Sequence, residues 1–230
     1  SRDEVILSSD AQNLTFAPAC GGALVEWDWR AMGLNLVNTL TRRPEGYHTL
    51  LKEAAAQGRL VVAGQEKTGW LSGDSRAVQV KEPGLQDRLF YDLYRRVCLI
   101  DHILPADTTL EQYYRCQHTE LGDFVTQPYT FLLSQMGDRL TLKLAREGSV
   151  LKNEARQPFH IEKTIMLAAG QLELDVIYVL TNTSDEPVGA QFGIENNWGI
   201  AGSDGPQAYS VWPGGALARL NDRHEVSSAK

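Results

Sequence analysis

The chain has 230 residues, of which 43% are hydrophobic, 22% charged and 8% aromatic, a composition typical of globular domains. Its 29 acidic residues outnumber 22 basic ones, and the formal net charge is −7. Proteins that neutralise nucleic-acid phosphates normally carry a basic surface, so the charge argues against a nucleic-acid partner. No apolar run approaches the roughly 18 residues of a membrane-spanning helix, so we expect no membrane partner.

The amino terminus and the cysteines bear on location. Residues 1–4 lack the basic-then-apolar order of a signal peptide. The chain has three cysteines, Cys20, Cys98 and Cys116. This number is odd and their spacing is not that of a metal site, which favours reduced thiols. We therefore expect a cytoplasmic protein. Because the chain does not begin with Met, we also expect it to be a piece of a larger one.

The first half of the chain mixes strand and helix signals. Residues 4–30 predict paired strands at 5–7, 14–16 and 23–25. Apolar residues at helical spacing after Pro44 predict a helix that ends near Gly58.

Two further segments of the first half are distinctive. Residues 63–88 are rich in Gly, Ser and charge, with Trp70 as the main apolar anchor, and predict a long excursion from the sheet. A short helix is expected within 106–116, where a side-chain oxygen of 107–109 caps the first turn.

Strand patterns dominate after about residue 124. Apolar side chains alternate with others in four segments, 140–144, 161–167, 172–180 and 188–194, with a turn at 181–187. Parallel strands would need crossovers of a dozen or more residues, so hairpins at this spacing favour antiparallel pairing. We predict an all-β fold with short helices, a large antiparallel β-sandwich formed by residues 1–230 as a single domain.

The last of these strands offers a row of polar side chains. If Val188, Ala190, Phe192 and Ile194 face the core, Gln191, Glu195 and Asn197 project from the opposite face, beside Trp198. Amides and carboxylates hydrogen-bond to sugar hydroxyls, and an indole packs on the apolar side of a pyranose. The row is a candidate carbohydrate site. The alternative is the ordinary solvated face of an antiparallel sheet.

A second concentration of polar and aromatic side chains lies at 35–48. It contains Arg42, Arg43, Glu45, Tyr47 and His48. Such a loop could hold a polyol ligand or dock a neighbouring domain, or its charges could simply cap the first turn of the following helix.

Metal and cofactor motifs are weak. The five histidines form no His-x-His or His-x-x-x-His pair, so we expect no transition-metal site. Asp101, His102 and residues 120–123 could supply oxygen ligands to calcium, but the sequence does not establish it. Phosphate-binding glycine loops and a Gly-x-Ser-x-Gly elbow are absent.

Several segments together resemble a known family. They are residues 21–26, 40–48, 91–102, 120–125, 162–164, 179–183 and 192–197. In this order, from about residue 10 to 200, they resemble the carboxy-terminal region of glycoside hydrolase family 57 α-amylases and 4-α-glucanotransferases.

The resemblance implies a galactose-mutarotase-like sandwich (a supersandwich) that follows a catalytic (β/α) barrel. The family's catalytic carboxylates belong to that barrel, and this chain lacks the strand–helix alternation of one, so no catalytic residue is carried over. The implied role is a non-catalytic accessory domain whose partners are the barrel of the same polypeptide and an α-glucan or maltooligosaccharide.

The alternative is a free-standing aldose-epimerase-like enzyme. Mutarotation needs one general base and one general acid near the sugar ring. Glu195 could serve as the base, and His102 or His48 as the acid.

Overall fold

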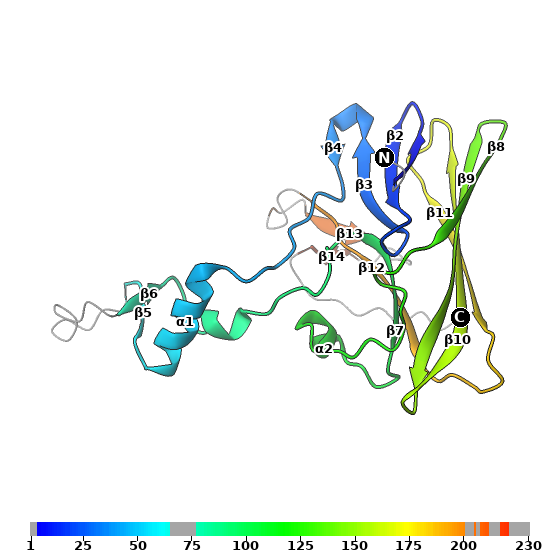
Figure 1. The fold of residues 1–230 in the computed structure, drawn as a ribbon. Helices are drawn as coiled ribbons and strands as arrows, with labels where there is room; N and C mark the ends of the chain where they lie inside the picture. Colours follow the sequence, from blue (N-terminus) through cyan, green and yellow to red (C-terminus); the bar gives the residue numbers. More distant parts are fainter. Residues whose placement is uncertain (1–3, 65–76, 201–204, 206–207, 212–216, 221–230) are drawn as a thin grey trace.

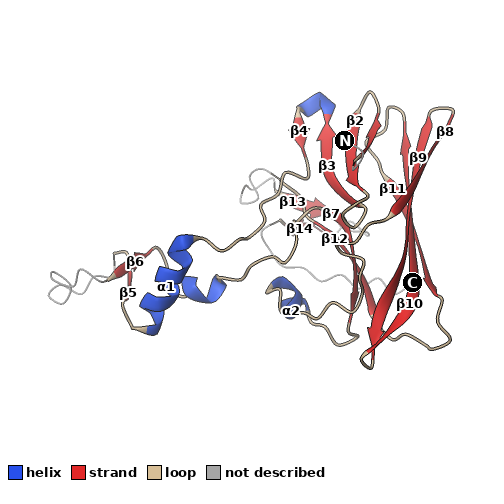
Figure 2. Ribbon diagram, viewed as in Figure 1, coloured by secondary structure: helices blue, strands red, loops and turns tan. Residues whose placement is uncertain are grey.

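The structure is a computed structural model that describes residues 4–64, 77–200, 205, 208–211 and 217–220. Two antiparallel sheets face each other, and a small lobe extends from one side of them (Figure 1). Strands form most of the regular secondary structure of the described residues (Figure 2), so the predicted all-β fold with short helices is confirmed.

The first sheet has six strands. They are β1 (Val5–Ser8), β2 (Gln12–Ala17), β3 (Ala23–Trp29), β4 (Leu34–Asn35), β7 (Cys98–Leu104) and β12 (Gln191–Asn196). The order is β1-β2-β3-β7-β12, with β4 paired to β3. A 3₁₀ turn, η1 (Arg30–Met32), joins β3 to β4.

The second sheet has four long strands. They are β8 (Thr130–Met136), β9 (Arg139–Lys152), β10 (Ala155–Ala168) and β11 (Asp175–Asn182), in the order β11-β10-β9-β8. All pairings in this sheet are antiparallel, as the spacing predicted. A small separate pair is formed by β13 (Tyr209–Val211) and β14 (Leu217–Arg219).

The lobe contains the described part of the predicted excursion at 63–88 together with the predicted helix before it. It holds α1 (Gly46–Ala56), the parallel pair β5 (Leu60–Val62) and β6 (Val78–Val80), and the 3₁₀ turn η2 (Leu85–Arg88). It stands on the side of the first sheet that faces away from the second (Figure 1). Trp70 lies outside the described residues.

The second predicted helix is α2 (Leu110–Tyr114). Thr109 caps it, because its Oγ1 accepts from the backbone N–H of Gln112 at 3.3 Å. Among the described residues, no helix has the length and apolar character needed to cross a membrane.

Strand bounds differ from the expectation near the carboxyl end. The strand predicted at 172–180 begins only at Asp175, and Val188 and Ala190 precede β12. Leu180 is 40% exposed although it shares the face of Val176 and Tyr178, which pack against the core.

The core lies between the two sheets and draws apolar residues from both. Leu7, Leu14, Phe16 and Leu24 come from the first sheet, and they are buried with residues of the second: Leu142, Leu144, Ile161, Ile165 and Leu167. Apolar burial of this kind is the main stabilising term of a sandwich.

A charged pair is buried in this core. Lys163 of β10 and Asp101 of β7 are both 0% exposed, and Nζ lies 2.9 Å from Oδ2. Nζ also donates to the carbonyls of Gly21 (3.0 Å) and Leu99 (2.8 Å). The hydroxyls of Tyr129 and Tyr178 donate to Asp101, so every polar group of the cluster is paired.

Leu99 is the extra residue of a β-bulge. Glu195 pairs with Ile100 and Asn196 with Cys98, so Leu99 has no partner in the ladder. Its φ of +58° is left-handed, which is uncommon for a residue with a side chain. The Asn196 side chain accepts from its N–H, and Lys163 donates to its carbonyl.

Candidate functional site

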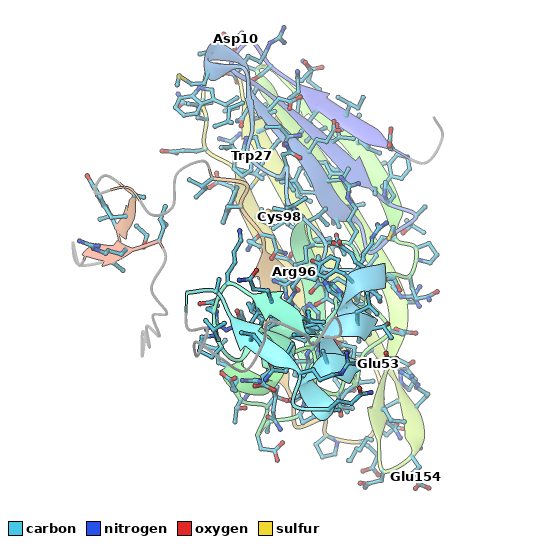
Figure 3. All side chains as sticks on the ribbon, turned by 90° about the vertical axis from the view of Figure 1, so that its left-hand side faces the viewer. Asp10, Trp27, Glu53, Arg96, Cys98 and Glu154 are labelled. Carbon is cyan, nitrogen blue, oxygen red and sulfur yellow. The ribbon has the colours of Figure 1, made fainter. Side chains whose placement is uncertain are left out.

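The face of the first sheet that points away from the second sheet, here called the outer face, carries a group of polar residues. The β7–β12 register pairs His102 with Gly193, and Glu195 lies two residues further along β12. Both side chains therefore share the outer face, whereas Asp101 points into the core. His102 Nε2 lies 3.2 Å from Glu195 Oε2. Figure 3 views the molecule from the side of this face and labels Arg96, whose contacts are described below.

Glu195 is held ionised by its hydrogen bonds. Tyr94 donates to Oε2 at 2.6 Å, Tyr113 donates to the same oxygen, and Asn197 Nδ2 donates to Oε1 at 2.8 Å. Burial alone would raise the pKa of Glu195, but bonds from His102, Tyr113 and Tyr94 outweigh it and lower the pKa to about 2. Burial and the adjacent carboxylate raise the pKa of both tyrosines, which therefore stay neutral donors.

His102 lies between two carboxylates. Its Nδ1 is 2.7 Å from Glu120 Oε2, and its Nε2 faces Glu195. Burial alone would lower the pKa of His102, but the two carboxylates outweigh it and raise the pKa to about 9. At neutral pH the imidazole is a cation shared by two anions.

Asp92 extends this network toward the lobe. Its Oδ1 accepts from Arg42 Nε at 2.9 Å and from Arg96 Nε at 2.8 Å. Burial alone would raise the pKa of Asp92, but the side-chain and backbone hydrogen bonds from Arg42, together with Arg96, lower it. Arg96 also donates to Asn197 Oδ1 at 3.3 Å and lies 3.9 Å from Glu195 Oε1. We call the connected set of Arg42, Asp92, Tyr94, Arg96, His102, Tyr113, Glu120, Glu195 and Asn197 the outer-face network.

A cavity of about 350 Å³ lies where the chain leaves the sandwich for the lobe. It is lined by Arg42, Arg43, Glu45 and His48 on one side and by residues 88–91 on the other. His48 is buried, stacks on Tyr91 and accepts from the Glu45 N–H through Nδ1 at 3.1 Å. The Arg42 guanidinium packs 4.5 Å from the Phe90 ring centre.

The structure brings only part of the expected sugar-binding row together. Glu195 and Asn197 join the outer-face network, but the Glu195 side chain is only 6% exposed. The exposed Gln191 lies at the other end of β12, where its amide donates to the Ala106 carbonyl at 2.6 Å. Trp198 is 45% exposed, and its ring lies 5.4 Å from that of Trp27.

The loop of 40–48 is also divided between two roles. Arg42, Glu45 and His48 bond within the domain. Arg43 and Tyr47 are exposed, and Tyr47 packs edge-on against His48 with ring centres 4.3 Å apart. Arg42, Glu45 and His48 therefore fit the capping role of this loop, and Arg43 and Tyr47 remain available for docking.

Sequence reasoning missed Tyr94, Arg96, Tyr113 and His118 as members of a site. Tyr113 lies in the short helix α2 and the other three lie in connecting segments, so strand alternation places none of them on a face of the sheet. Within the described chain, His102, His118 and Glu120 also form a group whose ligand atoms all lie within 4.8 Å of one another. The sequence offered only the His-x-Glu spacing of 118 and 120 as a signal for it.

Comparison with known proteins identifies the family. The family described as alpha-amylase/4-alpha-glucanotransferase, C-terminal, matches residues 1–230. Alpha-amylase 1 of Dictyoglomus thermophilum is 29% identical over 209 residues, which are 90% of this chain and 27% of that protein. The 4-alpha-glucanotransferase of Thermococcus kodakarensis is 32% identical over 200 residues, 86% of this chain and 27% of that protein.

A solved structure agrees with these sequence matches. The crystal structure of 4-alpha-glucanotransferase from Thermococcus litoralis superposes with a TM-score of 0.63 at 28% identity, covering 85% of this chain and 25% of that one. The chain thus spans about a quarter of the length of the relatives it matches. It belongs to the alpha-amylase/4-alpha-glucanotransferase family and corresponds to the C-terminal domain of its members.

Proposed function

We propose that this chain is a non-catalytic accessory domain of a family 57 glycoside hydrolase or glucanotransferase, a single galactose-mutarotase-like sandwich that supports a catalytic barrel of the same polypeptide. The observation that carries the proposal is that relatives named as these enzymes match the chain over only 27% of their length. The remaining three quarters of such a protein have room for the catalytic machinery.

The surface that supports contact with the barrel is the loop of 40–48 together with the start of α1. Leu40 is 91% exposed, Leu50 60% and Tyr47 58%, and Arg43 lies among them. Large apolar side chains gathered on one exposed segment are typical of an interaction surface. The outer-face network supports this surface because Arg42 fastens the loop to Asp92.

The experiment uses the full-length protein. We expect the double variant Arg43→Ala/Tyr47→Ala to lower glucanotransferase or amylase activity or the melting temperature. The matched control is Phe131→Ala/Arg139→Ala, which removes an exposed aromatic and an exposed arginine from the second sheet. Unchanged kinetics and melting in the loop variant, or impairment in the control alone, would count against this surface.

We also propose that the domain binds α-glucan or maltooligosaccharide weakly, with Trp198 as the stacking residue and Asn197 as the adjacent polar group. Of the other residues of the predicted row, Gln191 lies at the far end of β12 and Glu195 is enclosed. Trp198 supports the proposal best, because its exposed indole adjoins Trp27. Titration with maltoheptaose is expected to change tryptophan fluorescence in the wild type and not in Trp198→Ala. Unchanged tryptophan fluorescence in the wild type up to millimolar sugar would refute the proposal.

The epimerase alternative has one observation in its favour, the contact between His102 and Glu195. Against it, Tyr94 and Tyr113 occupy the acceptor sites of Glu195 that a sugar would need. Polarimetry distinguishes the two functions: an epimerase accelerates anomer exchange of glucose or galactose, and Glu195→Gln abolishes it. For this protein we expect no acceleration.

We further propose a cytoplasmic location. The three cysteines are free thiols, and Cys20 is exposed. An exposed thiol is compatible with a reducing compartment. Fractionation of cells that express the full-length protein tests this directly.

A further inference from the structure

Three side chains on the outer face form a group of the kind that holds a metal. His102 comes from β7, and His118 and Glu120 come from the segment that follows α2. The backbone N–H of Leu121 donates to the Ile103 carbonyl at 2.8 Å, which fastens this segment beside the strand. Imidazole nitrogen and carboxylate oxygen are the ligands zinc prefers. We propose that His102, His118 and Glu120 bind one Zn²⁺ ion, with a fourth position open to water.

Glu120 is already oriented for this role. Its Oε1 accepts from the backbone N–H groups of Ile103 at 2.8 Å and Gly122 at 3.2 Å. The other oxygen, Oε2, is turned toward His102 Nδ1 at 2.7 Å. A carboxylate fixed through one oxygen presents the second to a metal without loss of its backbone bonds.

His102 has the partner that a metal-binding histidine normally has. Its Nε2 lies 3.2 Å from Glu195 Oε2 and 3.1 Å from the Tyr113 hydroxyl. Donation from Nε2–H to a buried carboxylate fixes the tautomer in which Nδ1 carries the lone pair. Zinc then takes the place of the proton that Nδ1 shares with Glu120.

His118 supplies an unused donor atom. Its Nδ1 is buried and has no hydrogen-bond partner, which is rare for a polar atom in a folded protein. The ring stacks on Tyr113 with centres 4.7 Å apart and planes 28° apart, so its orientation is held.

The spacing of the ligands can adapt to zinc. Ligand atoms about 2.0–2.1 Å from a tetrahedral zinc are about 3.3 Å apart. The 2.7 Å contact between His102 and Glu120 therefore opens slightly, and the widest separation, within 4.8 Å, closes by up to about 1.5 Å. His118 and Glu120 are both partly exposed, so their side chains can make this movement and the open position can reach solvent.

The test measures zinc directly and does not depend on the accessory role proposed above. The full-length protein is freed of metal with a chelator and dialysed against micromolar Zn²⁺, and bound zinc is counted per chain. We expect His118→Ala and Glu120→Gln each to hold one zinc fewer than the wild type. His160→Ala is the matched control, because His160 alternates with the buried Ile161 and so points away from the core on β10.

Two further measurements complete the test. Glu195→Gln keeps all three ligands but weakens the support of His102, so we expect zinc affinity to fall about 10–100-fold. Cobalt(II) in place of zinc should give the intense visible bands of a four- or five-coordinate site, lost in His118→Ala. Equal zinc content and affinity in wild type and ligand variants would overturn the proposal. A wild-type cobalt spectrum that shows only six-coordinate bands would also overturn the proposal. This second result does not depend on whether the variants fold.

Discussion

Substituting Lys163→Met leaves the Asp101 carboxylate buried between the two sheets without a counter-charge. Both side chains are 0% exposed, so water cannot replace the lost ammonium group. Removing one partner of a buried ion pair costs about 3–5 kcal/mol. The hydroxyls of Tyr129 and Tyr178 still donate to Asp101, so we expect the lower end of that range, about 3 kcal/mol.

Urea unfolding of the chain, with thermal unfolding beside it, measures this cost. A loss of about 3 kcal/mol corresponds to a melting temperature lower by roughly 6–12 °C for a domain of this size. The double variant Lys163→Met/Asp101→Asn removes both charges. Its amide oxygen still accepts from one tyrosine and its NH₂ can donate to the other, so it should be more stable than Lys163→Met alone. It should remain below the wild type, because the carbonyls of Gly21 and Leu99 lose their donor.

The matched control is Lys143→Met in β9. Lys143 also pairs with a carboxylate at 2.9 Å, that of Glu162, but its side chain is 45% exposed. An exposed pair of this kind contributes about 0–1 kcal/mol. If Lys163→Met cost no more than Lys143→Met, or if the double variant were less stable than Lys163→Met, the reasoning from burial would be refuted.

Three further predictions concern single positions. Because its pKa is lowered in the fold, ionised Asp92 stabilises the fold above the pKa of an unfolded aspartate, and this stabilisation is lost as pH falls. Asp92→Asn should therefore flatten the decline of unfolding free energy below about pH 4. Parallel pH curves for the variant and the wild type would contradict this. Gly21→Ala should cost clearly more than Gly137→Ala in urea unfolding, because both have left-handed φ (68° and 61°) but only at Gly21 would a Cβ lie 2.2 Å from the Val125 carbonyl oxygen. Thr109→Ala should lower stability by about 1 kcal/mol through loss of the α2 cap, and Thr109→Ser should restore it.

Local patterns were sufficient for most elements of the fold. The helix at 46–56 follows from apolar spacing and ends before Gly58, whose φ is +64°. Lys163 lies on the buried face of β10 between Ile161 and Ile165, as the alternation of the strand requires. Its partner Asp101 is 62 residues away in the chain, and nothing local predicts that pairing. The strand order could not be predicted from local patterns either, because β7 pairs with β3 and β12, which are distant from each other in the sequence.

The polar row of β12 shows the same limit more sharply. Period-2 alternation placed Glu195 on the face away from the core, and it lies there. The alternative of an ordinary solvated face does not describe Glu195, because Tyr94 and Tyr113 close over its carboxylate. Both tyrosines come from segments outside the sheet, so the covering of this face depends on loop paths that alternation does not describe.

The charges of the outer-face network explain why so polar a group can be covered. The three carboxylates of Asp92, Glu120 and Glu195 are matched by three cations, Arg42, Arg96 and His102. Burying unpaired charge is costly, whereas a balanced and hydrogen-bonded set can be enclosed.

The balance also has a mechanical consequence. Arg42 belongs to the loop that leads into the lobe, Asp92 and Arg96 to the segment that returns from it, and Glu195 to the sheet. Both connections of the lobe are therefore anchored to the same charged group. An exposed loop held at both ends presents its apolar side chains to a partner with less conformational entropy to lose, which favours a fixed contact with the rest of the polypeptide over a loose tether.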